Sequence, residues 1–88
     1  MKVALSSTTL RSFSPGELVD TAERLGYRAV EIWSELLWAS GEDPAALGKS
    51  VRGKNLALSV HGPSRDINVT SLNAGIRRES RAQYLRSL

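Results

Sequence analysis

The chain contains no cysteine, which excludes disulfide bridges and thiolate metal sites. It has a single histidine, His61, which cannot alone supply the roughly three or four ligands that zinc takes from a protein. No apolar run approaches the roughly 20 residues needed to cross a bilayer, and the N-terminus is too short and too polar for a secretory signal. Serine-hydrolase and phosphate-loop motifs are also missing. These absences favour a soluble, cytoplasmic protein with no membrane partner.

The composition is that of one small folded domain. Its 88 residues are 41% hydrophobic and 24% charged, which gives no reason to expect disorder. The charges are unevenly distributed: residues 1–48 carry four Lys/Arg and seven Asp/Glu (net −3), whereas residues 49–88 carry eight and two (net +6). The basic half could contact phosphate on a nucleic acid or on a sugar phosphate, but a solvated helix face explains the same charges.

Three short segments alternate apolar residues with small or polar ones, as β-strands do: residues 2–7, 27–33 and 56–61. A capping box with proline at the first helical position predicts a helix over residues 15–25, which Gly26 ends. An Asp-Pro pair predicts a second helix over residues 44–54.

The remaining segments are less regular. A final helix is predicted from Asn73 or Ala74 to the end of the chain, with most of its arginines outward. Residues 34–42 fit either a helical turn or a loop. The order β-α-β-α-β-α predicts an α/β fold with a parallel sheet.

Aligning the three units predicts how the strands lie side by side. With the alanines of the three strands aligned, Glu31 lies between Ser6 and Ser59, and Trp33 and His61 lie at the carboxyl edge. One face of the sheet is then aliphatic and suited to helix packing. It carries Val3, Leu5, Val30, Ile32, Leu58 and Val60. The other face carries small residues first and polar residues toward the carboxyl edge, as does the inside of a barrel near its mouth.

Ligands bind at the carboxyl edge in parallel α/β folds, so candidate site residues are sought there. Trp33 could stack on a sugar ring or fill the interior. Asp66 and Asn68 follow the third strand and could hold substrate or metal, or set the loop through side-chain hydrogen bonds. An inward Glu31 needs a partner or a raised pKa, and His61 could be a ligand or a loop residue bonded to backbone.

The opening strand, the stretch LVDTAERLGYRAVEIW and the stretch VHGPSRDINVTSLNAGIRRES resemble the first three βα units of the xylose isomerase-like TIM barrels. That superfamily includes sugar isomerases, sugar phosphate isomerases/epimerases and type IV apurinic endonucleases. The resemblance implies that residues 1–88 are the N-terminal, incomplete part of a (βα)8 barrel, because 88 residues cannot close one. It implies a metal-dependent isomerase or epimerase of a sugar or sugar phosphate as the parent, with this chain inactive alone.

The resemblance also implies roles for two matching residues. Glu31 matches the acidic residue that ends strand two, and His61 matches the strand-three histidine, which lines the substrate pocket in isomerases. The parent's divalent metal (Mn, Mg, Co or Zn) would be held mainly by later strands. No catalytic residue is assigned within this chain, and the expected substrate-binding residues are Glu31, Trp33, His61, Asp66 and Asn68.

Two other interpretations remain open. In the endonuclease branch the parent would be a zinc phosphodiesterase acting on abasic DNA, with His61 as a metal ligand, and the basic second half favours this reading. Alternatively, the chain is not catalytic and assembles with itself or with another polypeptide through its open sheet edges.

Overall fold

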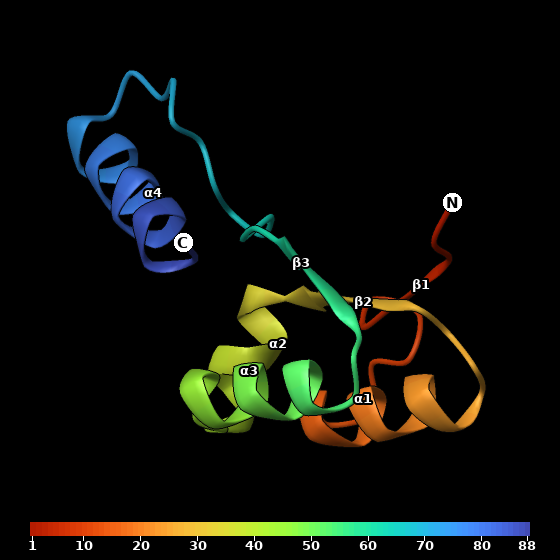
Figure 1. The fold of residues 1–88 in the computed structure, drawn as a ribbon. Coiled ribbons are helices and arrows are strands. Elements are labelled where there is room, and N and C mark those ends of the chain that lie inside the picture. Colours follow the sequence, from red (N-terminus) through yellow and green to blue (C-terminus); the bar gives the residue numbers. More distant parts are fainter.

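The computed structural model describes residues 1–88 as an α/β fold with one three-stranded parallel sheet and four helices (Figure 1). Along the chain the elements are β1 (Ala4–Ser6), α1 (Pro15–Arg24), β2 (Ala29–Trp33), α2 (Ser34–Ser40), α3 (Pro44–Gly53), β3 (Ala57–His61) and α4 (Ala74–Arg86). The predicted parallel sheet is therefore confirmed. The segment that fitted either a turn or a loop forms helix α2, and β1 is shorter than the predicted strand.

The strands lie in the order β1-β2-β3, with the predicted register. Ala29 pairs with Ala4 on one side and Ala57 on the other, and Glu31 pairs with Ser6 and Ser59. Trp33 pairs with His61 at the carboxyl edge. Since side chains alternate between faces along a strand, Glu31, Trp33 and His61 belong to the same face.

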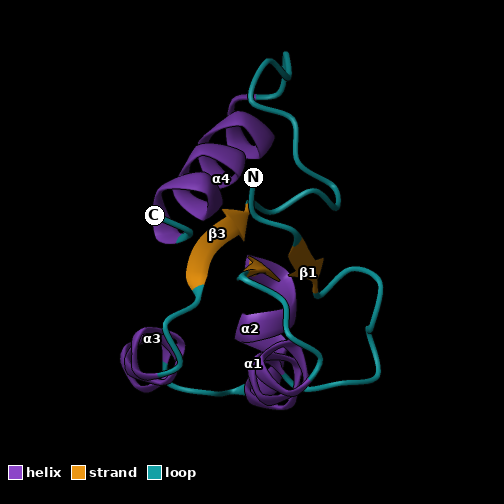
Figure 2. Ribbon diagram, turned by 45° about the vertical axis from the view of Figure 1, so that its right-hand side comes forward, coloured by secondary structure: helices purple, strands orange, loops and turns teal.

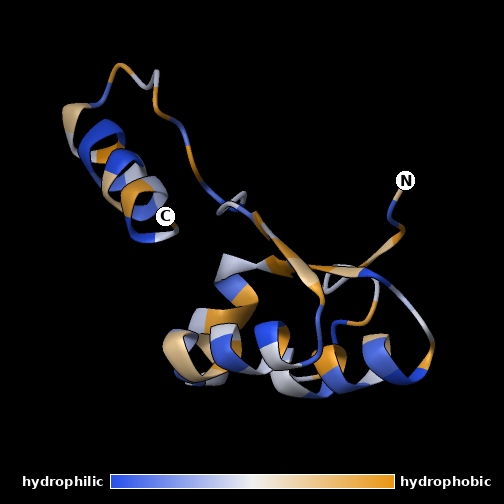
Figure 3. Ribbon diagram, viewed as in Figure 1, coloured by the Kyte–Doolittle hydropathy of each residue, from blue (hydrophilic) through white to orange (hydrophobic).

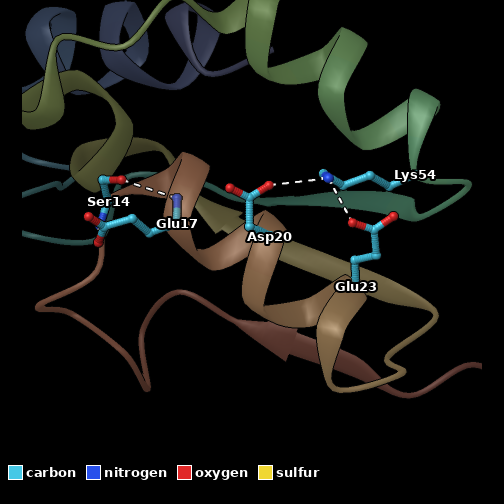
Figure 4. Close-up of polar contacts among 5 residues, drawn as sticks. All are labelled: Ser14, Glu17, Asp20, Glu23 and Lys54. Carbon is cyan, nitrogen blue, oxygen red and sulfur yellow. Dashed lines mark hydrogen bonds and ion pairs between the residues drawn. The ribbon is translucent and has the colours of Figure 1, made fainter.

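Local sequence signals explain how α1 begins and ends. The Ser14 side chain accepts a hydrogen bond from the Glu17 backbone N–H at 3.2 Å, and the Glu17 carboxylate accepts one from the Ser14 N–H at 3.1 Å (Figure 4). This capping box satisfies donors that the first helical turn leaves free. Gly26 follows with φ +80°, a left-handed conformation that side chains with a Cβ avoid.

Helices α1 and α3 pack on the aliphatic face of the sheet (Figure 2). The buried core joins these two helices to β2 and consists of Leu18, Val19, Ala22, Val30, Ile32, Leu47, Val51 and Leu56. At the end of α3, the Lys54 ammonium lies 2.7 Å from a Glu23 carboxylate oxygen and 3.2 Å from an Asp20 oxygen of α1 (Figure 4). The hydrogen bonds that Lys54 donates, first to Glu23 and then to Asp20, raise the pKa of Lys54 above 10.5.

The helices cover only part of the aliphatic face. Leu58 and Val60 of β3 are 47% and 53% exposed, whereas the alternation indicated a whole face suited to helix packing. Helix α4 stands apart from α1 and α3, beyond the long loop that follows β3 (Figure 1). The radius of gyration is accordingly 14.3 Å, against about 12 Å for a compact chain of this length.

The composition of α4 explains its position. The helix carries four arginines, much of it is hydrophilic in Figure 3, and its only buried residue is Ser80. Packing it on the sheet would therefore bury little apolar area. Its contacts with the rest of the chain include the Arg86 guanidinium, 4.4 Å from the Trp38 ring centroid, and the hydroxyl of Ser80, which accepts from the Asn68 backbone N–H. None of the helices is long and apolar enough to cross a membrane.

Candidate functional site

The candidate site lies at the carboxyl edge of the sheet, on the face opposite α1 and α3. The half-buried Glu31 is its acidic residue. The Ser6 hydroxyl donates a 2.7 Å hydrogen bond to Glu31 Oε1 and also lies 2.9 Å from the Thr8 hydroxyl. Ser59, on the other side in register, makes no such bond. Glu31 is thus held from β1, and its second oxygen remains free to accept from a ligand.

Trp33 and His61 meet at the end of their strands. Their ring centroids are 6.2 Å apart with an interplanar angle of 80°, an edge-to-face arrangement. The Trp33 backbone N–H donates to the hydroxyl of buried Ser7 at 2.8 Å, which ties the end of β2 to the turn after β1. Trp33 itself is only 5% exposed.

The hydrogen bond of His61 sets what its ring can do. Nδ1 lies 2.9 Å from the Gly62 carbonyl oxygen. Since a carbonyl only accepts, Nδ1 carries the proton, and in the neutral ring Nε2 is the acceptor. His61 can therefore accept a hydrogen bond or a proton from a ligand, or act as one metal ligand.

Two arginines that the sequence did not indicate as site residues also reach this edge. The Arg11 and Arg65 guanidinium carbons lie 5.7 Å and 4.6 Å from the Trp33 ring centroid. Arg11 follows β1, and Arg65 follows β3 within HGPSRDIN, the stretch that also contains Asp66 and Asn68. Arg65 could have been found as a cation beside these residues, whereas nothing in the sequence marks Arg11.

The loop residues Asp66 and Asn68 serve the loop in this structure. Asp66 is exposed, with φ 54°, a left-handed conformation that Asp tolerates better than most residues. The Asn68 side-chain oxygen accepts from the Thr70 N–H and hydroxyl at 3.1 Å and 3.0 Å. The Asn68 backbone N–H donates to Ser80 of α4. These bonds link Asn68 to α4 and not to Glu31 and His61, and a substrate-binding role for either residue stays a prediction.

The residues of this edge do not by themselves fit a divalent metal. Nowhere in the chain do three or more His, Asp or Glu side chains gather closely enough to hold an ion. His61 could be at most one ligand of a site completed by other residues. The divalent metal that the resemblance implies therefore stays a prediction about a longer parent protein.

Comparisons with protein-family models, with curated proteins and with solved structures give no match. The functional interpretation is therefore built on the arrangement at the carboxyl edge. One imidazole and two guanidinium groups come together there around one indole ring, and a carboxylate held by Ser6 lies on the same face two residues earlier in β2. Such a set can bind a polar, oxygen-rich and anionic ligand.

Proposed function

We propose that residues 1–88 form the first three βα units of a sugar phosphate isomerase/epimerase-like barrel, with Glu31 and His61 in its substrate-binding mouth. One observation carries the proposal: the two side chains come from neighbouring parallel strands and one face, with His61 at the carboxyl edge and Glu31 two residues before the end of β2. Ligands bind at this edge in parallel α/β folds.

Glu31 and His61 each have a binding role in the proposal. The free Glu31 oxygen accepts a hydrogen bond from a sugar hydroxyl, while Ser6 holds the carboxylate in place. His61 Nε2 accepts from a second hydroxyl or from the opened sugar chain. The proton transfers of isomerisation next to a carbonyl are assigned to residues outside this chain, so we expect no turnover from residues 1–88 alone.

The uncovered part of the sheet supports a larger barrel. In a closed barrel every strand has two neighbours and every aliphatic side chain on the outer face packs against a helix. β1 and β3 each have one unpaired edge, and Leu58 and Val60 are half exposed. A further βα unit beside β3 would cover both features.

The decisive test begins with the reading frame beyond the Leu88 codon. The proposal expects about 160 further residues with βα periodicity. The longer protein should isomerise or epimerise sugar phosphates with Mn, Mg or Co. Glu31→Gln and His61→Asn should each lower kcat/KM by about tenfold or more, while Ser59→Ala, on the other side of Glu31, should change it little. A frame without βα periods, or full activity in both variants, would refute the proposal.

The same uncovered surface favours a second candidate, a non-catalytic chain that assembles through its sheet edges. Exposed apolar residues beside an unpaired strand favour pairing with another chain. Light scattering after size-exclusion chromatography tests this candidate, because Val60→Lys should then dissociate the assembly. A folded monomer at high protein concentration would eliminate it.

A further inference from the structure

We propose that Arg11, Arg65 and Trp33 form an anion subsite that binds the phosphate group of a phosphorylated sugar. The inference rests on the proposed function and deepens it, because it assigns residues of this chain to the phosphate group of the substrate. The three residues follow or end the three strands, so each strand contributes one member at the carboxyl edge.

The two cations are gathered on one ring and have no anionic partner. The guanidinium carbons of Arg11 and Arg65 lie 5.7 Å and 4.6 Å from the Trp33 ring centroid. The ion pairs of the chain involve only Lys54. Two guanidinium groups present planar sets of donors that match the oxygens of phosphate.

An independent observation points to a missing acceptor at the same place. The Trp33 indole Nε1–H is buried and has no hydrogen-bond partner, in a residue only 5% exposed. A buried donor without an acceptor costs free energy, and indole nitrogen can only donate. In the proposal, an oxygen of a phosphate bound by the two guanidinium groups supplies this acceptor.

The loops that carry the arginines are held by other contacts. Arg11 Nε donates to the Thr8 carbonyl oxygen at 3.1 Å, which leaves its terminal nitrogens free. The Glu35 carboxylate accepts from the backbone N–H groups of Ser64 and Arg65 at 3.2 Å and 3.3 Å. Glu35 thereby fixes the loop after β3 through its backbone and leaves the Arg65 side chain available.

A second arginine-tryptophan pair provides a matched control. Arg86 lies over Trp38 at 4.4 Å, a contact as close as those at Trp33. The Trp38 indole nitrogen, however, is not among the buried atoms that lack a partner. Cation-π contact is therefore common to both sites, whereas the paired guanidinium groups and the buried unpartnered donor occur only at Trp33.

The test follows the two indole N–H resonances of the 88-residue chain by NMR, with Trp38→Phe used to assign them. The titrants are inorganic phosphate, glucose 6-phosphate and glucose, each at constant ionic strength. Phosphate and glucose 6-phosphate should move the Trp33 resonance downfield and saturate, and glucose should not. Arg11→Met and Arg65→Met should each weaken phosphate binding by about tenfold, and Arg86→Met should leave it unchanged. Arg65→Lys, which keeps the charge but loses the planar fork, should give a smaller loss.

Several outcomes would overturn the subsite. These are an equal shift with chloride, an equal shift with glucose, equal losses for Arg86→Met and Arg65→Met, or a DNA oligonucleotide that binds at Trp33 more tightly than glucose 6-phosphate. Failure here is distinguishable from failure of the proposed function. Glu31→Gln should retain phosphate binding, because Glu31 takes no part in the subsite, and it should lose activity only in the longer protein.

Discussion

The hydrogen bond from Ser6 to Glu31 allows a quantitative test of how the site carboxylate is held. Removing the donor with Ser6→Ala should destabilise the fold, since a hydrogen bond to a charged group contributes about 1.5–3 kcal/mol when buried. Glu31 is half-buried, so we expect a coupling between the two side chains of about 1–2 kcal/mol. A chain of 88 residues has a total stability of about 4–13 kcal/mol, so this loss is measurable.

The coupling is best measured with a double-mutant cycle, because Ser6 also contacts Thr8. Wild type, Ser6→Ala, Glu31→Leu and the double variant are unfolded in urea at pH 7 and followed by circular dichroism. With a urea slope of about 1 kcal/mol per molar, the cycle should show a midpoint difference of about 1–2 M. Ser59→Ala is the control, since Ser59 pairs with Glu31 in register without bonding to it. Equal losses for the two serine variants, or zero coupling, would refute the assignment of Ser6 as the partner of Glu31.

Two further predictions concern the scaffold. Leu18→Ala should lower the free energy of unfolding by about 2–5 kcal/mol because Leu18 is fully buried between α1 and the sheet. Leu85→Ala on α4 should change it by no more than about 0.5 kcal/mol. Equal losses for the two variants in urea unfolding would contradict this prediction and mean that α4 packs on the core. The pKa of Lys54 is raised in the folded state, first by Glu23 and then by Asp20, so this contact stabilises fully below the unfolded pKa of about 10.4 and is lost as pH rises through the folded pKa. Between about pH 8 and 12 the free energy of unfolding should fall more steeply with pH for wild type than for Lys54→Met. The same pH dependence in both proteins would contradict a stabilising role of the Lys54 contact.

The register of the sheet was predictable because side chains alternate between the two faces of each strand. A slip of one residue would move Val30 and Ile32 out of the core and Glu31 into it, so a period-two pattern repeated in three strands leaves one arrangement. The start of α1 was also predictable, because its capping box lies within four residues. These features depend on neighbouring residues and on alternation, both of which can be read directly from the sequence.

The arginines and α4 could not be predicted in this way. Where a guanidinium group lies depends on the loop that carries it and on a long side chain. The sequence places Arg65 beside other candidate residues, but no local signal indicates that Arg11 and Arg65 meet at Trp33. The position of α4 depends on how much apolar area its packing would bury, which is a tertiary quantity. Helix propensity predicts that α4 forms, but it does not say against what it packs.

The unfilled hydrogen-bonding groups of the edge favour a small polar ligand over a protein partner on this face. Burying this face under a partner chain would cost less free energy if Glu31 and Trp33 were both replaced by apolar residues, because burying an unpaired polar group is unfavourable. Instead β2 presents a free carboxylate oxygen at Glu31 and an unpartnered indole donor at Trp33. The two residues are two positions apart on one face, about 6.6 Å along the strand. An acceptor at Glu31 and two guanidinium groups over Trp33, on the same face of β2, match a molecule with hydroxyls at one end and phosphate at the other.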